Sequence, residues 1–120
     1  MSKQLLDTCL GSRIEGAASS LENFAVRLSG DRGIIFEASG NQASFRVAWR
    51  VVDGDSLPDL HEAVCSVDWS WIAGSTIEAF HEVGPGIRLD LEPAGPLTIS
   101  TALWESKPFL SFQPYKPAKK

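Results

Sequence analysis

The sequence lacks long hydrophobic runs, which are the first requirement of a membrane protein. None of its 120 residues lies in a stretch approaching the roughly 18 apolar residues of a membrane-spanning helix. The start, Met-Ser-Lys-Gln-Leu-Leu-Asp, has an apolar run of only two residues and so lacks the core of a secretory signal. Cysteine is also scarce, with only Cys9 and Cys65, and two thiols without a signal are typical of a reducing compartment. These absences predict a cytoplasmic protein with no membrane partner.

Positive charge is also in short supply. The chain has 11 Lys and Arg against 15 Asp and Glu, which gives a formal net charge of -4. Phosphate binding needs a basic footprint, so we expect no direct binding of nucleic acid. Residues 114–120 are rich in proline and lysine and predict a solvated, flexible tail. The acidic balance suits a basic partner, although mild acidity also serves solubility alone.

Motifs of catalysis and cofactor binding are missing as well. There is no Gly-x-Ser-x-Gly elbow, no Gly-x-Gly-x-x-Gly loop and no Walker-type loop. His61 and Cys65 are four residues apart and, with His81, could supply half a zinc site, but zinc sites usually carry two closely spaced ligand pairs. We therefore expect no enzyme, no metal and no cofactor. A Ser-His-Asp triad has no fixed spacing, so a hydrolase using His61 or His81 is the remaining catalytic alternative.

What the sequence does contain is an internal repeat. Gly-Ser-x-Ile-Glu occurs at residues 11–15 and again at 74–78, 63 residues later. Two further segments match in the same order: 25–28 with 86–89 at an offset of 61, and 34–36 with 97–99 at 63. Three matched segments in one order predict a duplication, covering approximately 3–52 and 57–113, within a single domain of residues 1–120.

The repeated segments read as β-strands, because apolar and polar residues alternate along them. Short turn-forming segments separate the alternating stretches, as in antiparallel hairpins. The predicted strands are 12–16, 24–29, 33–38 and 44–52 in the first half and 75–81, 86–92, 97–103 and 108–113 in the second. The predicted fold class is therefore mostly β, with a minor α+β component. The two antiparallel meanders form a sandwich or a small barrel.

Two segments have helical spacing. Residues 3–10 carry apolar side chains at helical intervals and end at Gly11, a residue typical of helix ends. Residues 57–65 follow Ser56, a capping residue, and place Pro58 in the first turn. We therefore expect one or two short helices, one before each copy of the repeated motif.

Charged side chains at repeated positions predict ion pairs within the sheets. Glu15 with Arg27, and Glu78 with Arg88, would face each other on adjacent strands. They could mark two equivalent binding positions, but the simpler interpretation is a structural pair inherited with the repeat. Arg46 and Arg50 could form a basic patch, or each could have an acidic partner on a neighbouring strand.

The segment between the two halves is the best candidate for function, because the repeat does not constrain it. No Lys or Arg occurs within 53–68, and aromatic residues follow the acids. Charge speeds the encounter with a basic partner and aromatic side chains hold the contact. The predicted partner-binding residues are Asp53, Asp55, Asp59, Glu62, Asp68 and Trp69. Alternatively, the acids solvate a linker, and Trp69 and Trp71 both belong to the core.

The paired Gly-Ser-x-Ile-Glu units, the closing segment 107–112 and the acidic stretch 53–68 together give the chain a family resemblance. A short, acidic β domain of this kind resembles the immunity proteins of bacterial polymorphic-toxin and contact-dependent growth-inhibition systems. The resemblance implies a protein that binds and neutralises one cognate toxin domain, often a basic nuclease. The alternative is a β module that binds a small molecule or associates with itself.

Overall fold

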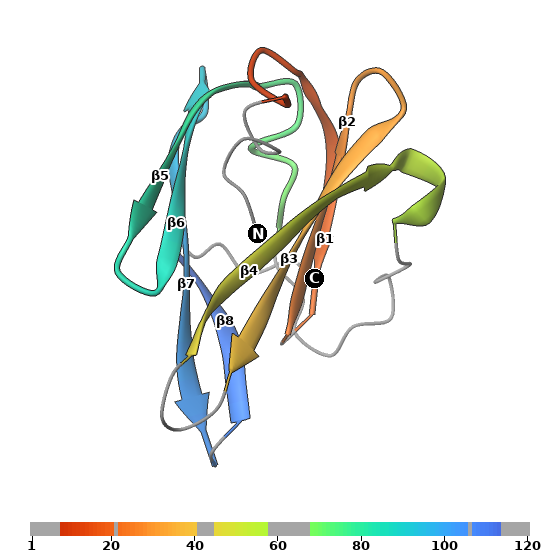
Figure 1. The fold of residues 1–120 in the computed structure, drawn as a ribbon. Helices are drawn as coiled ribbons and strands as arrows, with labels where there is room; N and C mark the ends of the chain where they lie inside the picture. Colours follow the sequence, from red (N-terminus) through yellow and green to blue (C-terminus); the bar gives the residue numbers. More distant parts are fainter. Residues whose placement is uncertain (1–7, 21, 41–44, 58–67, 106, 114–120) are drawn as a thin grey trace.

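The computed structural model describes residues 8–20, 22–40, 45–57, 68–105 and 107–113. They form two four-stranded antiparallel sheets that pack as a sandwich, which confirms the mostly β fold class (Figure 1). The first sheet has the strands β1 (Ile14–Ser19), β2 (Asn23–Leu28), β3 (Arg32–Gly40) and β4 (Phe45–Asp53) in that order. The second has β5 (Thr76–Val83), β6 (Gly86–Glu92), β7 (Gly95–Trp104) and β8 (Lys107–Gln113).

Alternation along the strands decides which side chains enter the core. In β2 the buried side chains include Phe24, Val26 and Leu28, and in β6 they are Ile87, Leu89 and Leu91. β3 departs from this pattern, because three successive residues, 34–36, are buried and both faces of the strand are therefore covered. Part of the cover is Leu57, whose side chain occupies the space in which a Cβ on Gly33 would stand.

The two sheets repeat one register throughout. Ile14 pairs with Leu28, and Ile77 pairs with Leu91, each residue 63 positions further on. The same shift of 63 relates the pair Val26–Ile34 to Leu89–Leu97, and Phe36–Trp49 to Ile99–Phe112. The predicted offset of 61 for residues 25–28 is therefore wrong, because the first hairpin turn has the same length in both halves and no drift occurs.

Each glutamate of the repeated motif lies in a β-bulge. The pairing of β1 with β2 shifts between Ile14 and Gly16, and that of β5 with β6 shifts between Ile77 and Ala79. Glu15 and Glu78 are therefore the extra residues of two equivalent bulges, where the side chain is turned out of the regular ladder. The sheets thus share an irregularity as well as their regular pairing, which gives the two halves a repeat-like arrangement.

The bulges explain why the predicted glutamate–arginine pairs are wrong. Arg27 lies opposite Gly16 and donates from Nη2 to the carbonyl oxygen of Gly54, 3.2 Å away. In the second sheet, Nε of Arg88 donates to Oδ1 of Asp90 at 3.0 Å. Neither arginine meets the glutamate of its own half.

The partner predicted for Arg50 is present on the neighbouring strand. Nη1 of Arg50 lies 2.7 Å from Oε1 of Glu37 on β3. Both side chains are well exposed, so the pair contributes little to stability. Arg50 is therefore part of a surface ion pair rather than of a basic patch.

The predicted helices fall mostly outside the described residues. Of 3–10, only residues 8–10 are described, and they lie in a turn; of 57–65, only Leu57 is described, and its backbone is extended. A short 3-10 helix, η1 (Gly54–Ser56), comes before it. Within the described ranges no helix is long and apolar enough to span a membrane. The predicted tail, 114–120, also lies outside them.

The two copies of the repeated motif pair with each other where the sheets meet. Gly11 N donates to Ile77 O at 2.8 Å, and Gly74 N donates to Ile14 O at 2.7 Å. Ile14 N donates to Ser75 O at 2.8 Å, and Ile77 N donates to Ser12 O at 3.0 Å. Replacing each residue of one bond by the residue 63 positions away in the other half gives its counterpart, so the four bonds are related by an approximate twofold axis between the sheets.

Glycine is required at the start of each copy. Gly11 has φ +82° and Gly74 has φ +89°, a left-handed conformation that costs a residue with a Cβ about 1–2 kcal/mol. A Cβ at either position would meet no other atom within 4 Å, so the cost is conformational rather than steric. We expect Gly11→Ala and Gly74→Ala each to lower the free energy of unfolding by about 1–2 kcal/mol, measured by urea denaturation.

Gly16→Ala is the matched control. Its Cβ would also meet nothing within 4 Å, and its φ is not in the left-handed region. We expect its effect to stay within about 0.5 kcal/mol. A loss at Gly16 as large as that at Gly11 would contradict the conformational explanation.

Candidate functional site

Three exposed carboxylates gather where β4 ends. Asp53 and Asp55 flank Gly54, whose N–H donates to the carbonyl oxygen of Asp31, 2.9 Å away in the β2–β3 turn. The Asp31 carboxylate lies against Gly54, in the space where a Cβ would otherwise stand. We call Asp31, Asp53 and Asp55 the acidic corner. Sequence analysis missed Asp31, which only the pairing of Arg32 with Asp53 brings to this place.

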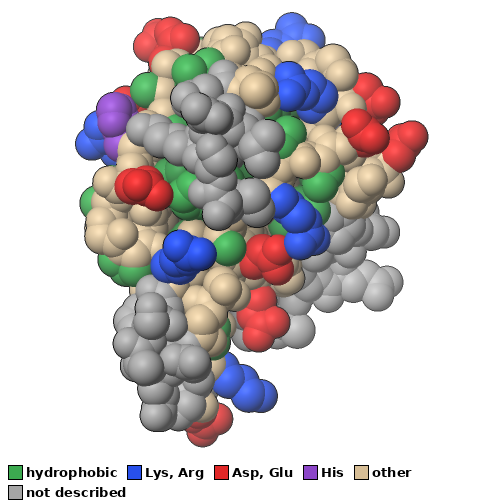
Figure 2. Space-filling model, in the orientation of Figure 1, with side chains coloured by type: hydrophobic (Ala, Val, Ile, Leu, Met, Phe, Trp, Pro, Cys, Tyr) green, Lys and Arg blue, Asp and Glu red, His purple; other side chains and the backbone are tan. Residues whose placement is uncertain are grey.

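The arginines beside the acidic corner are engaged with other groups. Arg27 donates to the carbonyl oxygen of Gly54. Arg32 donates from Nη1 to the carbonyl oxygen of Thr8 at 2.9 Å and from Nη2 to its hydroxyl oxygen at 2.7 Å. Within the part of the chain that the structure describes, none of the three carboxylates forms a salt bridge. Figure 2 shows acidic side chains grouped near basic ones on the side where η1 lies.

The described residues do not bring the whole predicted acidic set together. Asp59 and Glu62 lie outside the described residues. Asp68 accepts from the N–H of Ser70 at 2.9 Å and from its hydroxyl at 2.6 Å, and its neighbour Trp69 reaches Ser19. Ser19 lies roughly 16 Å along β1 from the end of the sheet that carries Asp53. Asp53 and Asp55 are therefore adjacent, whereas Asp68 belongs to a different part of the surface.

Trp69 belongs to the core, so its predicted role as a partner contact is wrong. The side chain is only 5% exposed, and its ring centroid lies 4.4 Å from that of Phe24 and 4.8 Å from that of Phe112. Its Nε1 donates to the hydroxyl oxygen of Ser19 at 3.0 Å. The alternative interpretation of Trp69 as core is confirmed, and Trp71 packs against the same cluster.

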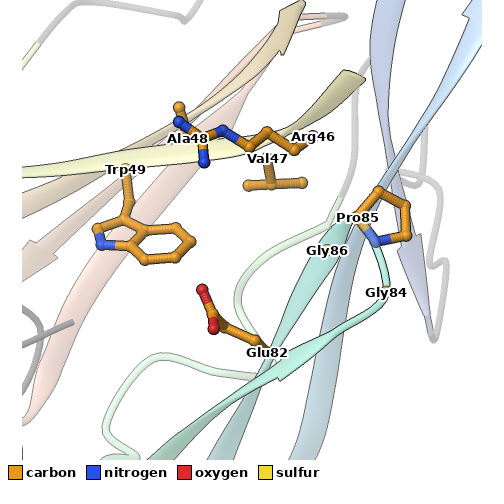
Figure 3. A pocket seen from close by; sticks show the side chains of 8 residues that line it. All are labelled: Arg46, Val47, Ala48, Trp49, Glu82, Gly84, Pro85 and Gly86. Atoms are coloured by element: carbon orange, nitrogen blue, oxygen red, sulfur yellow. The ribbon is translucent and has the colours of Figure 1, made fainter. Parts of the chain in front are cut away.

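A small pocket of about 80 Å³ opens between β4 and the β5–β6 hairpin (Figure 3). Val47 N donates to Pro85 O at 2.7 Å and joins the two elements. Trp49 is 7% exposed, and in Figure 3 its six-membered ring, rather than its nitrogen, faces the carboxylate of Glu82. We call this the Trp49 pocket; it is lined by Arg46, Val47, Ala48, Trp49, Glu82, Gly84, Pro85 and Gly86.

Sequence analysis also missed the Trp49 pocket. The one signal for it was Glu82, which follows the buried Phe80 by two residues and so falls on the inward side of β5. A charged residue at an inward position near the end of a strand indicates an opening between the sheets.

A second polar cluster lies on the outer face of the second sheet. Asp90 receives Nε2 of His81 at 2.9 Å on one oxygen and Nε of Arg88 at 3.0 Å on the other. His81 is thereby engaged with a carboxylate, while His61 and Cys65, the other members of the candidate zinc site, lie outside the described residues. Among the described residues no group of three or more His, Cys, Asp or Glu is placed to hold a metal ion.

Cys9 is a free thiol in the core, at the position equivalent to Ile72. Burial raises the pKa of the Cys9 thiol, against the smaller opposing effects of a hydrogen bond with Thr8 and the charge of Arg32. A buried thiol with a raised pKa is a poor nucleophile, so Cys9 serves packing.

No family model, curated protein or solved structure matches this chain. The acidic corner and the Trp49 pocket are the two candidate binding features of the described residues.

We expect Ser19→Ala to lower the free energy of unfolding by about 1–3 kcal/mol, because it leaves the buried N–H of Trp69 without an acceptor. In a Trp69→Phe background, which has no indole N–H at this position, Ser19→Ala should cost much less. The two variants and their combination form a double-mutant cycle, read by urea denaturation. Additive effects would contradict a coupling through this hydrogen bond.

Cys9 should react slowly with a thiol reagent in the folded protein. In a Cys65→Ser variant, whose remaining thiol is Cys9, we expect alkylation to be at least about 100-fold slower in buffer than in denaturant, because reaction requires opening of the core. Mass spectrometry follows the modification. Equal rates in the two conditions would show that Cys9 is accessible.

Proposed function

We propose that this protein is an inhibitor of the immunity type, which binds a basic toxin domain and covers its surface with the acidic corner. The observation that carries the proposal is the set of exposed carboxylates at Asp31, Asp53 and Asp55, none of which is neutralised by a salt bridge within the described residues. The net charge of -4 acts in the same direction. A basic nuclease is the class of toxin that this charge suits best.

The acidic corner is suited to binding because its geometry is fixed before the partner arrives. Gly54 holds the β2–β3 turn against the end of β4 through its hydrogen bond to Asp31. Arg27 holds the next peptide, through its hydrogen bond to the carbonyl oxygen of Gly54. Prepositioned charges lose little conformational entropy on binding, and like charges close together attract a cationic surface over a distance of about one Debye length.

A second candidate function is a binding module for a small polar molecule. An open groove of about 800 Å³ runs over the outer face of the second sheet, beside the Asp90 cluster. Five of its eight lining residues are polar or charged, and they include Arg88, Asp90, Thr98 and Gln113. A cytoplasmic location stays a prediction for either function.

The test measures binding to the toxin domain encoded beside this chain's own gene. We expect the triple variant Asp31→Lys, Asp53→Lys and Asp55→Lys to slow association by about 10–1,000-fold, with a smaller effect at high salt. Stopped-flow kinetics at low and high salt gives the rates, and circular dichroism checks the fold.

The control reverses the same amount of charge elsewhere. Glu15, Glu22 and Glu78 are exposed, and a triple change of these residues to Lys alters the net charge equally. Association slowed as much by the control as by the corner variant would contradict the assignment of the site. A neighbouring toxin domain that the wild-type chain fails to bind would contradict the proposed function.

A further inference from the structure

The repeat gives the Trp49 pocket a counterpart within the same molecule. A shift of 63 places Trp49 at the position of Phe112, Glu82 at that of Ser19, and Ile87 at that of Phe24. The pocket therefore lies between β4, β5 and β6, and its counterpart lies between β8, β1 and β2. The strands that line the two places pair in the same register, whereas position 6, which the shift of 63 equates with Trp69, lies outside the described residues.

The counterpart is filled. The ring of Trp69 lies on Phe24 and Phe112, and its N–H donates to Ser19. The counterpart therefore accommodates a flat group whose N–H is donated to an acceptor on the edge strand β1. At the Trp49 pocket the corresponding acceptor is the exposed carboxylate of Glu82 on β5, and a pocket of about 80 Å³ lined by described residues lies beside it.

The Trp49 pocket and its counterpart differ at two residues, and both differences change which ligand would fit. A carboxylate at position 82, where the counterpart has a hydroxyl, favours a positively charged N–H donor over a neutral one. The indole at position 49, where the counterpart has a phenyl ring, is the best aromatic partner for a cation. Both changes favour a cationic group.

The volume decides which flat group can enter. An apolar cavity of about 150 Å³ is known to bind benzene. The Trp49 pocket, at about 80 Å³, is too small for an aromatic ring but accepts a planar guanidinium group. A guanidinium also stacks on aromatic rings and presents paired N–H groups to a carboxylate, which an ammonium does not.

We propose that the Trp49 pocket binds an arginine side chain of the protein partner, with its guanidinium against the Trp49 ring and paired with Glu82. The proposal rests on the proposed function in one respect, namely that the partner is a basic protein. Arg46 stands at the mouth of the pocket, exposed and on the outer side of β4. Its charge opposes an incoming cation, so removing it strengthens binding.

The test uses N-acetyl-arginine methylamide as the probe and the full chain as the receptor. Its citrulline counterpart, which has the same shape without the charge, is the control ligand. Titrations at low salt are followed through the indole N–H resonance of Trp49, assigned by its loss in Trp49→Phe. We expect a saturable shift with the arginine probe alone, with a dissociation constant on the order of 10 mM, the affinity that one cation–π contact and one carboxylate pair supply.

Three variants, the first of them taken from the repeat, test which residues bind the probe. Glu82→Ser installs the residue of the counterpart position and should weaken binding of the probe by at least tenfold. Arg46→Gln should tighten it about twofold to fivefold, because it removes a like charge. Glu78→Gln removes an exposed carboxylate from the same strand outside the pocket and should change nothing. Equal shifts with arginine and citrulline, or unchanged binding in Glu82→Ser, would overturn the proposal.

The test of the Trp49 pocket can be separated from the test of the acidic corner. A variant with Asp31, Asp53 and Asp55 changed to Asn should keep the response of Trp49 to the probe, because none of these residues lines the pocket. In binding to the toxin domain, Glu82→Ser should cost at least tenfold in affinity in this neutralised background too. Intact probe binding with no effect of Glu82→Ser on the complex would overturn the arginine of the partner as the occupant, whereas the acidic corner would be unaffected.

Discussion

Four backbone hydrogen bonds between the two Gly-Ser-x-Ile-Glu segments hold the sandwich together. They join the start of the first sheet to the start of the second and are related by an approximate twofold axis. A sheet with one apolar face must bury that face against another element. The reciprocal bonds fix how one apolar face meets the other, and Ile14 and Ile77, which take part in them, are both fully packed. The positions of the acidic corner and the Trp49 pocket follow from this one junction.

The strands were predictable because burial of one face imposes alternation, and turn residues mark the ends. β6 has the predicted bounds, and the other strands differ by a few residues at their ends. The pairing of charges was not predictable, because each motif glutamate lies in a bulge that shifts the neighbouring register. A bulge adds one residue to a strand, and an alternating pattern as short as this one does not reveal the extra residue. Glu15 and Glu78 were therefore predicted at regular outward positions.

The candidate site was also predictable from the sequence only in part. Exposure of Asp53 and Asp55 followed from local polarity, but the addition of Asp31 depends on which turn the strand pairing brings beside Gly54. Trp69 and Trp71 alternate with a serine, a pattern that fits either a surface anchor or a core strand, and packing on Phe24 decided for the core. The Trp49 pocket depends on residues from both halves, and the inward position of Glu82 alone does not show what lies opposite it.

The positions at which the two halves differ are the informative ones, because the shared positions build the scaffold. The central proposal is that the acidic corner on the first sheet and the Trp49 pocket between the two sheets both meet a basic protein. Hydrogen–deuterium exchange of the chain, alone and mixed with the toxin domain that the proposed function assigns to it, tests this most directly. The account predicts slower exchange at the described part of β4, at η1 and at the β5–β6 hairpin, with no change on β7. Protection confined to β7 and β8 would contradict it.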